Sequence, residues 1–375
     1  MEYQITLPKK TMVGKGIISR VDFGKYGKKP LIVTGKYTAK THAAAELISL
    51  THGEVFDGIT GEPTNIMIES GVAAYRAASC DYIIGIGGGS ALDSAKAIGA
   101  MSVLSGKISD FMGKEITGDF PPLVLIPTTA GTGSEATKFT VITDTETDVK
   151  MLLKGDDLLP DLALLDFTLT FSAPKSVTAA TGMDALTHAV ESYTSRKANP
   201  ITDLFALSAI KRIFTYLPIA YNNPEDETAR EQLSLAAYEA GVCINNASVT
   251  LVHGMSRPIG ALFHVPHGIS NAMLDVKCLE FAAEGAAGKF ADIAREIGID
   301  EPDSITAAKG FLEKLSGLCR AVEIPTLAEY GIDREKFFAA IDKMSSDAIA
   351  SGSPANTIRE VTKEDCAAIY KSLWS

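Results

Sequence analysis

Short apolar runs alternate with helical segments through the first half of the chain, and this alternation strongly constrains the fold. Four runs are rich in apolar and β-branched residues and are typical of strands: residues 29–34 (KPLIVT), 81–86 (DYIIGI), 123–127 (LVLIP) and 140–143. Helical patterns separate the first three runs: residues 38–50, 71–80 and 90–104. Strands of a parallel sheet that helices cover on both faces are apolar throughout. The pattern therefore predicts an α/β domain with a Rossmann-like parallel sheet.

The second half of the chain has a different pattern. From about Pro174 onward strand patterns are almost absent, and helices are predicted over residues 203–216, 227–247, 288–297, 303–318 and 334–344. A chain of 375 residues is long enough for two domains. We therefore predict an α/β domain over residues 1–172 and an all-helical domain over residues 173–375.

A glycine-rich loop follows the strand at residues 81–86. Gly87, Gly88, Gly89 and Ser90 open the next helix, which contains Asp93. Glycine allows a backbone to approach an anion closely, and a helix N-terminus offers unpaired N–H groups. A glycine turn after a strand often only reverses the chain. The order strand, loop, helix favours a dinucleotide pyrophosphate site instead.

A second loop, PTTAGTGSE, leaves the strand at residues 123–127. Thr128, Thr129 and Thr132 place hydroxyls where ligands bind on open α/β sheets, outside the carboxyl ends of the strands. These hydroxyls suit a phosphate or the nicotinamide amide. The alternative is a loop that only caps the following helix, and the residues alone do not decide between the two.

Histidines and one carboxylate gather in the helical half. Asp184 and His188 are four residues apart, so a helix places them on one face, and His253 and His267 lie in a later segment with His264 between them. One carboxylate and three imidazoles suit a divalent ion such as iron or zinc. Polar groups in apolar helices are costly to bury without partners. The two remaining histidines, His42 and His52, are expected to be solvated.

Composition limits the other classes of function. Asp and Glu number 46 against 35 Lys and Arg, giving a net charge of −11, so the electrostatic footprint of a nucleic-acid-binding protein is missing. Five dispersed cysteines without a CxxC pair argue against disulfides and thiolate zinc sites. Residues 1–20 contain no signal-peptide pattern, and no run of about 18 apolar residues is present. We expect a cytoplasmic protein with neither a membrane nor a nucleic acid as partner.

Taken together, the motifs resemble those of the iron-containing (group III) alcohol dehydrogenases nearly from end to end. The matching stretches are GKG at Gly14, GGGSxxDxxK at 87–96, PTTAGTGSE at 127–135, GMDALTHAVE at 182–191, VHG at His253, PHG from Pro266 and NTIREVT from Asn356. The resemblance implies an N-terminal dinucleotide-binding domain and a helical C-terminal domain, as in dehydroquinate synthase-like proteins, with the active site in the cleft.

The resemblance also implies a reaction and a set of site residues. Asp184, His188, His253 and His267 correspond to the family's metal ligands, with Fe²⁺ expected first and Zn²⁺ as the alternative. The metal would act as a Lewis acid on the oxygen of a small alcohol or aldehyde, while hydride is exchanged with the nicotinamide. Asp93, Thr137 and Lys150 are expected to join the cofactor site, and the enzyme is expected to be a homodimer.

Cofactor preference is predicted from the end of the first strand. Enzymes that prefer NAD often carry an acidic residue there, which accepts the ribose 2′-OH and repels the phosphate of NADP. This chain has Gly35 followed by Lys36. We therefore predict NADP over NAD, with use of both cofactors as the alternative.

Two departures from the family pattern affect the expected chemistry. Arg257 stands where many members have a histidine thought to relay a proton, and arginine has no acceptor for one. Proton exchange would then pass through water or His264, with Arg257 packing or binding a cofactor phosphate. Alternatively, Arg257 binds an anionic group of the substrate. Residues 275–277 read DVK, where the family usually continues with a leucine–proline pair, and the sequence offers no reason.

Three other functions remain alternatives. A lyase or cyclase of the dehydroquinate synthase type needs several Lys and Arg around its substrate, and the segments around the four metal ligands carry only Arg257. A glycerol dehydrogenase-like enzyme would perform the same class of reaction. A binding protein without catalysis is disfavoured by the intact ligand set.

Overall fold

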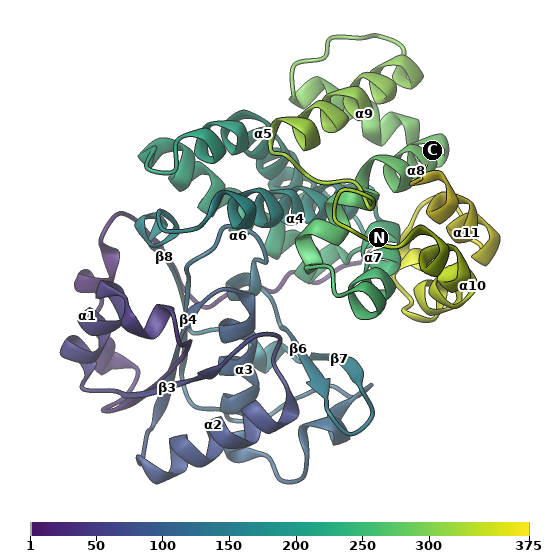
Figure 1. Cartoon of the computed structure of the whole chain (residues 1–375). Coiled ribbons are helices and arrows are strands. Elements are labelled where there is room, and N and C mark those ends of the chain that lie inside the picture. Colours follow the sequence, from purple (N-terminus) through teal and green to yellow (C-terminus); the bar gives the residue numbers. More distant parts are fainter. Residues whose placement is uncertain (1, 375) are drawn as a thin grey trace. The chain divides into compact units, whose positions relative to one another are not determined.

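The computed structural model describes residues 2–374, and the chain forms two compact units (Figure 1). One unit is Thr6–Ala173, and the other begins at Pro174, continues to the C-terminal end and includes the short segment up to Ile5. The sequence prediction placed the boundary between residues 172 and 173. Each unit has its own core and is described separately.

A six-stranded, fully parallel sheet forms the centre of the α/β unit, with the strand order β1-β8-β5-β4-β2-β3. The strands are β1 (Thr11–Val13), β2 (Pro30–Gly35), β3 (Glu54–Ile59), β4 (Tyr82–Gly87), β5 (Leu123–Pro127) and β8 (Leu162–Leu165). The helices are α1 (His42–Thr51), α2 (Asn65–Ala77) and α3 (Gly89–Val103). The predicted parallel α/β domain is confirmed.

Alternation along the central strands divides the core between the two faces of the sheet. Leu31 and Val33 of β2 pack in one buried cluster with residues of α2 and α3. Ile32, between them, packs in a second cluster with Leu47 of α1. Because successive side chains of a strand point to opposite faces, strands covered on both sides must be apolar throughout. This is why these strands are recognisable in the sequence.

Three strands of the main sheet, β1, β3 and β8, were not predicted from the sequence, and one predicted strand belongs to a different sheet. The run at 140–143 is a strand, β6 (Phe139–Asp144), but it pairs antiparallel with β7 (Val149–Lys154) in a separate two-stranded sheet. β1 has only three residues, and β3 at the sheet edge is mostly exposed or half-buried. β8 (LALL) is apolar and buried, but it is four residues long and has no β-branched residue, so it was not recognised as a strand. The helix predicted over 38–50 is a 3₁₀ turn, Thr38–Lys40, followed by α1.

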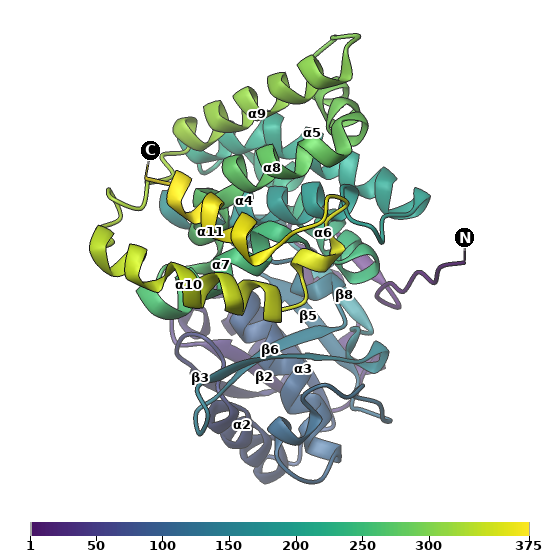
Figure 2. The same ribbon diagram turned by 90° about the vertical axis from the view of Figure 1, so that its right-hand side faces the viewer.

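The second unit is all helical among the described residues (Figure 2). Its helices are α4 (Lys175–Tyr193), α5 (Pro200–Asn222), α6 (Glu227–Ala247), α7 (Leu251–Phe263), α8 (His267–Glu296), α9 (Ser304–Ala321), α10 (Arg334–Ala350) and α11 (Lys363–Ser372). The helix predicted over 288–297 is the end of the much longer α8, which is interrupted by non-helical backbone at Ala286. Helix α4 contacts α5, α6, α7 and α8, so most of its side chains are buried.

One helix in the described part of the chain, α5, is long and apolar enough by length and composition to cross a membrane. Its buried residues include Ala206, Ile210, Ile213 and Leu217, and the helix packs against α4 and α6. Packing within the helical unit therefore accounts for the apolar composition of α5.

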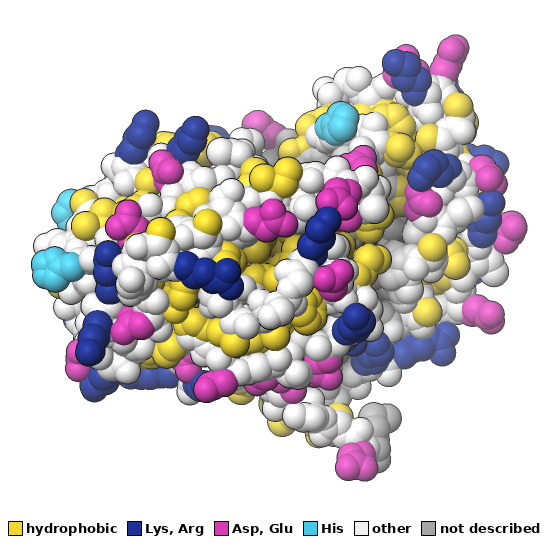
Figure 3. All heavy atoms as spheres, turned by 90° about the horizontal axis from the view of Figure 1, so that it is seen from below, with side chains coloured by type: hydrophobic (Ala, Val, Ile, Leu, Met, Phe, Trp, Pro, Cys, Tyr) yellow, Lys and Arg dark blue, Asp and Glu magenta, His cyan; other side chains and the backbone are white. Residues whose placement is uncertain are grey.

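On the molecular face drawn in Figure 3, acidic and basic side chains are interspersed.

Candidate functional site

Three neighbouring strands bring the predicted cofactor residues to one edge of the sheet. Val33 of β2 is in register with Gly85 of β4, and Gly87 of β4 is in register with Pro127 of β5. The strands are parallel, so their carboxyl ends lie at the same edge. Gly35, the glycine loop and the loop from Thr128 therefore all leave the sheet there. Ligands of open α/β sheets bind at this edge, where the strand order reverses.

Close packing between the two loops explains the glycines. The backbone N–H of Thr128 donates to the Gly87 carbonyl oxygen at 2.9 Å. Gly87 has φ of 150°, and a Cβ there would lie 2.8 Å from that of Ala91. A Cβ on Gly89 would lie 2.8 Å from Cγ2 of Thr132. A side chain at either position would crowd the start of α3.

Polar groups without a protein partner surround this loop. Ser90, Thr128 and Thr129 are half-buried, and their hydroxyls form no hydrogen bond within residues 2–374. Helix α3 begins after Gly88 and has no side-chain cap. Uncapped N–H groups and free hydroxyls at a helix N-terminus suit the pyrophosphate of a dinucleotide.

Three other predicted cofactor residues bond to the protein itself. Asp93 accepts from the Ser134 hydroxyl at 2.5 Å and from the Val141 N–H at 2.8 Å. Thr137 accepts from Lys96 Nζ at 3.1 Å. Lys150 of β7 forms an ion pair with Glu62 at 2.6 Å. Asp93 and Thr137 therefore support the site through their contacts with the loop after β5.

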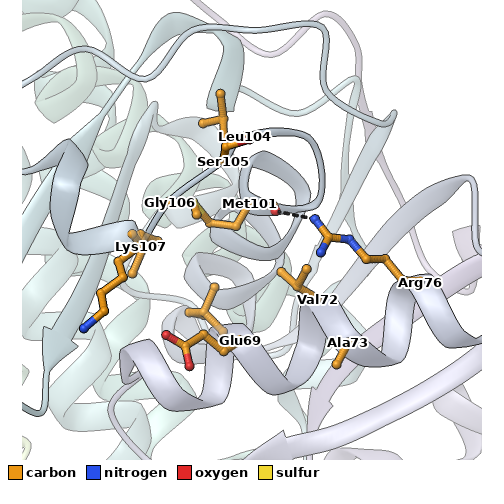
Figure 4. A pocket seen from close by; sticks show the side chains of 11 residues that line it. Glu69, Val72, Ala73, Arg76, Met101, Leu104, Ser105, Gly106 and Lys107 are labelled. Carbon is orange, nitrogen blue, oxygen red and sulfur yellow. Dashed lines mark hydrogen bonds between the residues drawn. The ribbon is translucent and has the colours of Figure 1, made fainter.

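A cavity of about 440 Å³ also lies in this unit, between α2 and the segment that follows α3 (Figure 4). It adjoins the C-terminal end of α3, about 20 Å from the glycine loop at the other end of this helix. Its two cations are engaged, because Arg76 donates to the carbonyl oxygens of Met101 and Ser102 and Lys107 pairs with Glu146. The cavity is therefore distinct from the predicted cofactor site.

In the helical unit, the four predicted metal ligands converge. Asp184 and His188 come from α4, His253 from α7, and His267 is the first residue of α8. The Nε2 atoms of His188, His253 and His267 lie 3.9, 3.8 and 3.6 Å from the Asp184 Oδ1. Four ligands at about 2.1 Å from a tetrahedral ion would lie about 3.4 Å apart. The ligand atoms all lie within 4.8 Å of one another, so the residues fit a divalent ion.

Three of the four clustered residues are buried, and burial affects the pKa values of His253 and Asp184. Asp184, His188 and His253 are buried, and His267 is partly exposed. Burial lowers the pKa of His253 well below its usual value, and the neighbouring imidazoles lower it further. For Asp184, burial raises the pKa, but the three imidazoles and Asn271 outweigh it and lower the pKa overall. A neutral imidazole at His253 and an ionised carboxylate at Asp184 are the protonation states in which these two side chains bind metal.

Two residues beside the cluster were missed from the sequence. Glu191 Oε2 lies 2.6 Å from His253 Nδ1, and Asn271 Nδ2 donates to Asp184 Oδ1 at 2.7 Å. Glu191 is the last residue of the GMDALTHAVE stretch, and Asn271 lies one helical turn after His267. Helical spacing from the ligands was the signal that could have identified them.

The two predicted catalytic residues differ in position. Arg257 lies one turn after His253 on α7, is half-buried, and forms no hydrogen bond or ion pair in the described part of the chain. His264 is exposed and ends α7 in a left-handed conformation, with φ of 55°. No hydrogen bond, ion pair or ring contact joins His264 to the four predicted ligands within residues 2–374. The geometry therefore favours Arg257 over His264 as a residue of this site.

The structure shows what Asp275 does in residues 275–277 (DVK), where the sequence departs from the family pattern. Asp275 on α8 is buried, and the Thr187 hydroxyl lies 2.9 Å from each of its carboxylate oxygens. Burial raises the pKa of Asp275 well above its usual value. Thr187 precedes the predicted ligand His188, so Asp275 ties α8 to the turn of α4 that carries this histidine.

A parallel α/β unit with a phosphate-type loop, together with a helical unit holding a buried His₃Asp set, is typical of a metal-dependent, nucleotide-linked oxidoreductase. Two family models match this chain: iron-containing alcohol dehydrogenase over residues 8–167, and the C-terminal region of the Fe-containing alcohol dehydrogenase family over residues 178–374. The chain belongs to the iron-containing alcohol dehydrogenase family.

Relatives along the whole chain agree with this assignment. The NAD-dependent methanol dehydrogenase of Bacillus methanolicus is 34% identical, with 98% of this chain and 98% of that protein covered. The NADPH-dependent butanol dehydrogenase of Clostridium saccharobutylicum is 31% identical, with 99% and 98% covered. A crystal structure of 1,3-propanediol oxidoreductase is 34% identical, has a TM-score of 0.96 and covers 100% of both chains. The protein is accordingly an oxidoreductase, an NAD(P)-linked alcohol dehydrogenase.

Proposed function

We propose that this enzyme interconverts small alcohols and aldehydes at a single divalent ion held by Asp184, His188, His253 and His267. The observation that carries the proposal is the convergence of three Nε2 atoms on one oxygen of Asp184, with Asp184, His188 and His253 buried in the helical unit and His267 partly exposed. Iron is the first choice, from the family, and zinc suits the same ligands.

Each group has a defined task in this proposal. When bound, the ion supplies Lewis acidity to the substrate oxygen and the nicotinamide carries the hydride. The glycine loop and the start of α3 hold the pyrophosphate, while the hydroxyls of Ser90, Thr128 and Thr129 bond the cofactor. Asp93 and Thr137 keep the loop after β5 in place through Ser134 and Lys96.

NADP is the cofactor we propose in preference to NAD. Gly35 at the end of β2 offers no carboxylate to repel a 2′-phosphate, and Lys36 beside it is exposed, with no ion pair in the described part of the chain. The relatives include both an NAD-dependent and an NADPH-dependent enzyme, so the family leaves this choice open. A homodimer in the cytoplasm also remains our prediction from the sequence.

The ligand set is tested by replacing His267 with Ala. We expect the variant to lose bound Fe²⁺ or Zn²⁺ and metal-dependent turnover of simple aldehydes, measured by metal analysis and by oxidation of NADPH or NADH. His42→Ala is the control, because His42 is exposed and lies in the α/β unit. Unchanged metal affinity in His267→Ala would refute the ligand set, and absence of turnover in the metal-loaded native enzyme would refute the reaction.

A further inference from the structure

Hydrogen-bond donors surround the carboxylate of Glu191. This residue lies on α4, is fully buried, and forms no ion pair with Lys or Arg in the described residues. Its Oε1 accepts from the backbone N–H of Val252 at 2.6 Å and from the hydroxyl of Thr250 at 2.7 Å. Its Oε2 lies 2.6 Å from Nδ1 of His253. A backbone N–H can only donate, so Oε1 must be an acceptor.

The opposite side of the His253 ring gives independent evidence. Asn271 places its amide nitrogen 2.7 Å from Asp184 Oδ1. The reverse orientation would set the amide oxygen against an ionised carboxylate, so the nitrogen must face Asp184. The same nitrogen lies 3.2 Å from Nε2 of His253. It also lies 3.3 Å from Nε2 of His267, so the hydrogen that does not face Asp184 is shared between the two rings. Donation of this hydrogen to Nε2 of His253 requires a lone pair there, which places the His253 proton on Nδ1.

We propose that Glu191 is a positioning residue that holds His253 in the Nδ1–H tautomer and thereby directs the Nε2 lone pair at the metal. The inference rests on the proposed function, in which His253 is a ligand. Metal-binding histidines commonly donate their other N–H to a carboxylate, which fixes the ring and increases its basicity. The proposal assigns this task to Glu191.

Glu191→Gln should weaken metal binding in two ways: it removes a negative charge, and it changes the tautomer of His253. The Gln oxygen must still face the N–H of Val252, so its NH₂ group faces Nδ1 of His253. An NH₂ group donates, and Nδ1 can accept only if its proton moves to Nε2. A protonated Nε2 cannot bind metal. The isosteric amide therefore stabilises the wrong tautomer.

The affinity of the purified full chain for Zn²⁺ tests this by competition with a chromophoric chelator. We expect Glu191→Gln to bind Zn²⁺ roughly 10- to 100-fold more weakly than the native chain, which is the usual loss when a carboxylate that hydrogen-bonds a metal-binding histidine is replaced. Glu239→Gln is the matched control, because Glu239 is a half-buried carboxylate of the same unit that pairs with Arg212 and Ser208 of α5. Circular dichroism verifies that each variant is folded.

A second measurement reads the tautomer directly. Long-range ¹H–¹⁵N spectra of the metal-free protein labelled in its six histidines, assigned with His253→Ala, should show protonated Nδ1 in His253. The metal-free protein is used because bound zinc would itself exclude a proton from Nε2. Equal zinc affinity in Glu191→Gln and Glu239→Gln would overturn the proposal, as would an Nε2–H tautomer in the native protein. If Glu191→Gln does not fold, the native spectrum alone decides. If His267→Ala binds zinc as tightly as the native chain, the proposed metal site fails as well.

Discussion

At the scale of single residues, the structure limits the roles that Arg257 can have. It lies one turn from His253, and burial lowers its pKa while the charge of Glu191 raises it. Arginine nevertheless stays protonated, because its ordinary pKa is above about 12. It cannot replace a histidine as a proton acceptor. A half-buried cation without a hydrogen bond in residues 2–374 is suited to an anionic group of the substrate or cofactor.

Arg257→Ala distinguishes these two partners. If Arg257 binds a carboxylate of the substrate, kcat/KM for an acidic aldehyde should fall by roughly ten- to a hundredfold, the loss of about 1.5–3 kcal/mol, with little change for a neutral aldehyde of equal length. Steady-state kinetics on the matched pair measures this. Arg257→Lys should retain part of the activity on the acidic substrate. Equal losses on both aldehydes would point to the cofactor or to packing.

Lys36 and Gly35 carry the prediction of cofactor preference. Lys36→Ala should lower kcat/KM for NADPH several-fold and leave NADH unchanged, because only NADPH has a 2′-phosphate to pair with a cation. Gly35→Asp should shift preference toward NADH. A Cβ at Gly35 would lie 3.0 Å from the carbonyl oxygen of Ile59, so Gly35→Ala is needed to separate crowding from charge. A native enzyme that clearly prefers NADH would contradict the prediction.

At the scale of elements, a buried polar network joins α3 to the loop after β5 and to β6. Lys96 of α3 donates to Ser134, Thr137 and the carbonyl oxygen of Phe139. Burial lowers the pKa of Lys96 to about 8, and the charges of Asp93 and Glu135 partly oppose this. For Glu135, burial raises the pKa to about 7, and its Oε2 has no hydrogen-bond partner among residues 2–374. The loop beside the cofactor site therefore rests on groups that are costly to bury charged.

Glu135 should make stability depend on pH. Its pKa rises from 4.5 to about 7 on folding, so the folded state holds the proton more tightly. Protonated Glu135 therefore contributes to the free energy of unfolding in full below pH 4.5, and this contribution is lost as pH rises to about 7. The free energy of unfolding should fall by an amount on the order of 3 kcal/mol across this range. Glu135→Gln should remove this slope in urea unfolding followed by circular dichroism. Glu54→Gln, which replaces an exposed carboxylate of β3, should keep the pH dependence of the native protein. Parallel curves of unfolding free energy against pH for the native and Glu135→Gln proteins would contradict the role given to Glu135.

At the scale of the whole molecule, the proposed metal ligands come from helices that are distant in the sequence. Asp184 and His267 are 83 residues apart, yet their side-chain atoms lie 3.6 Å apart, and α4, α7 and α8 each supply at least one ligand. An ion bound by three helices stabilises the folded helical unit over its unfolded chain.

Metal removal should therefore lower the melting temperature of the helical unit. At a free metal concentration of 100 times Kd the stabilisation is about 2.7 kcal/mol, or roughly 5–10 °C for a unit of this size. The single tryptophan, Trp374, packs on Phe337 and Phe338 of this unit, so its fluorescence reports the transition. Chelator should shift the native protein and leave His267→Ala unaffected. An equal shift in both proteins would show that the stabilising ion binds elsewhere.

The sequence by itself determined the features that depend on local pattern. The central strands β2, β4 and β5 were recognisable because burial on both faces requires continuous apolar side chains. Helix α6 was predicted with its observed bounds, Glu227–Ala247, from its helical periodicity, and in the structure the Asp226 side chain caps its start. Asp184 and His188 could be paired because four residues make one helical turn.

Only the tertiary structure decided which distant residues meet. β1 and β8 are too short to have a pattern and exist through their pairing with each other and with β5. Residues 140–143 could be recognised as a strand, but not as one half of a separate hairpin, because pairing partners are not local. Glu191 and Asn271 have ordinary helical positions in the sequence. Their importance comes from contacts with His253 and Asp184 across 62 and 87 residues, which only the packing of α4, α7 and α8 creates.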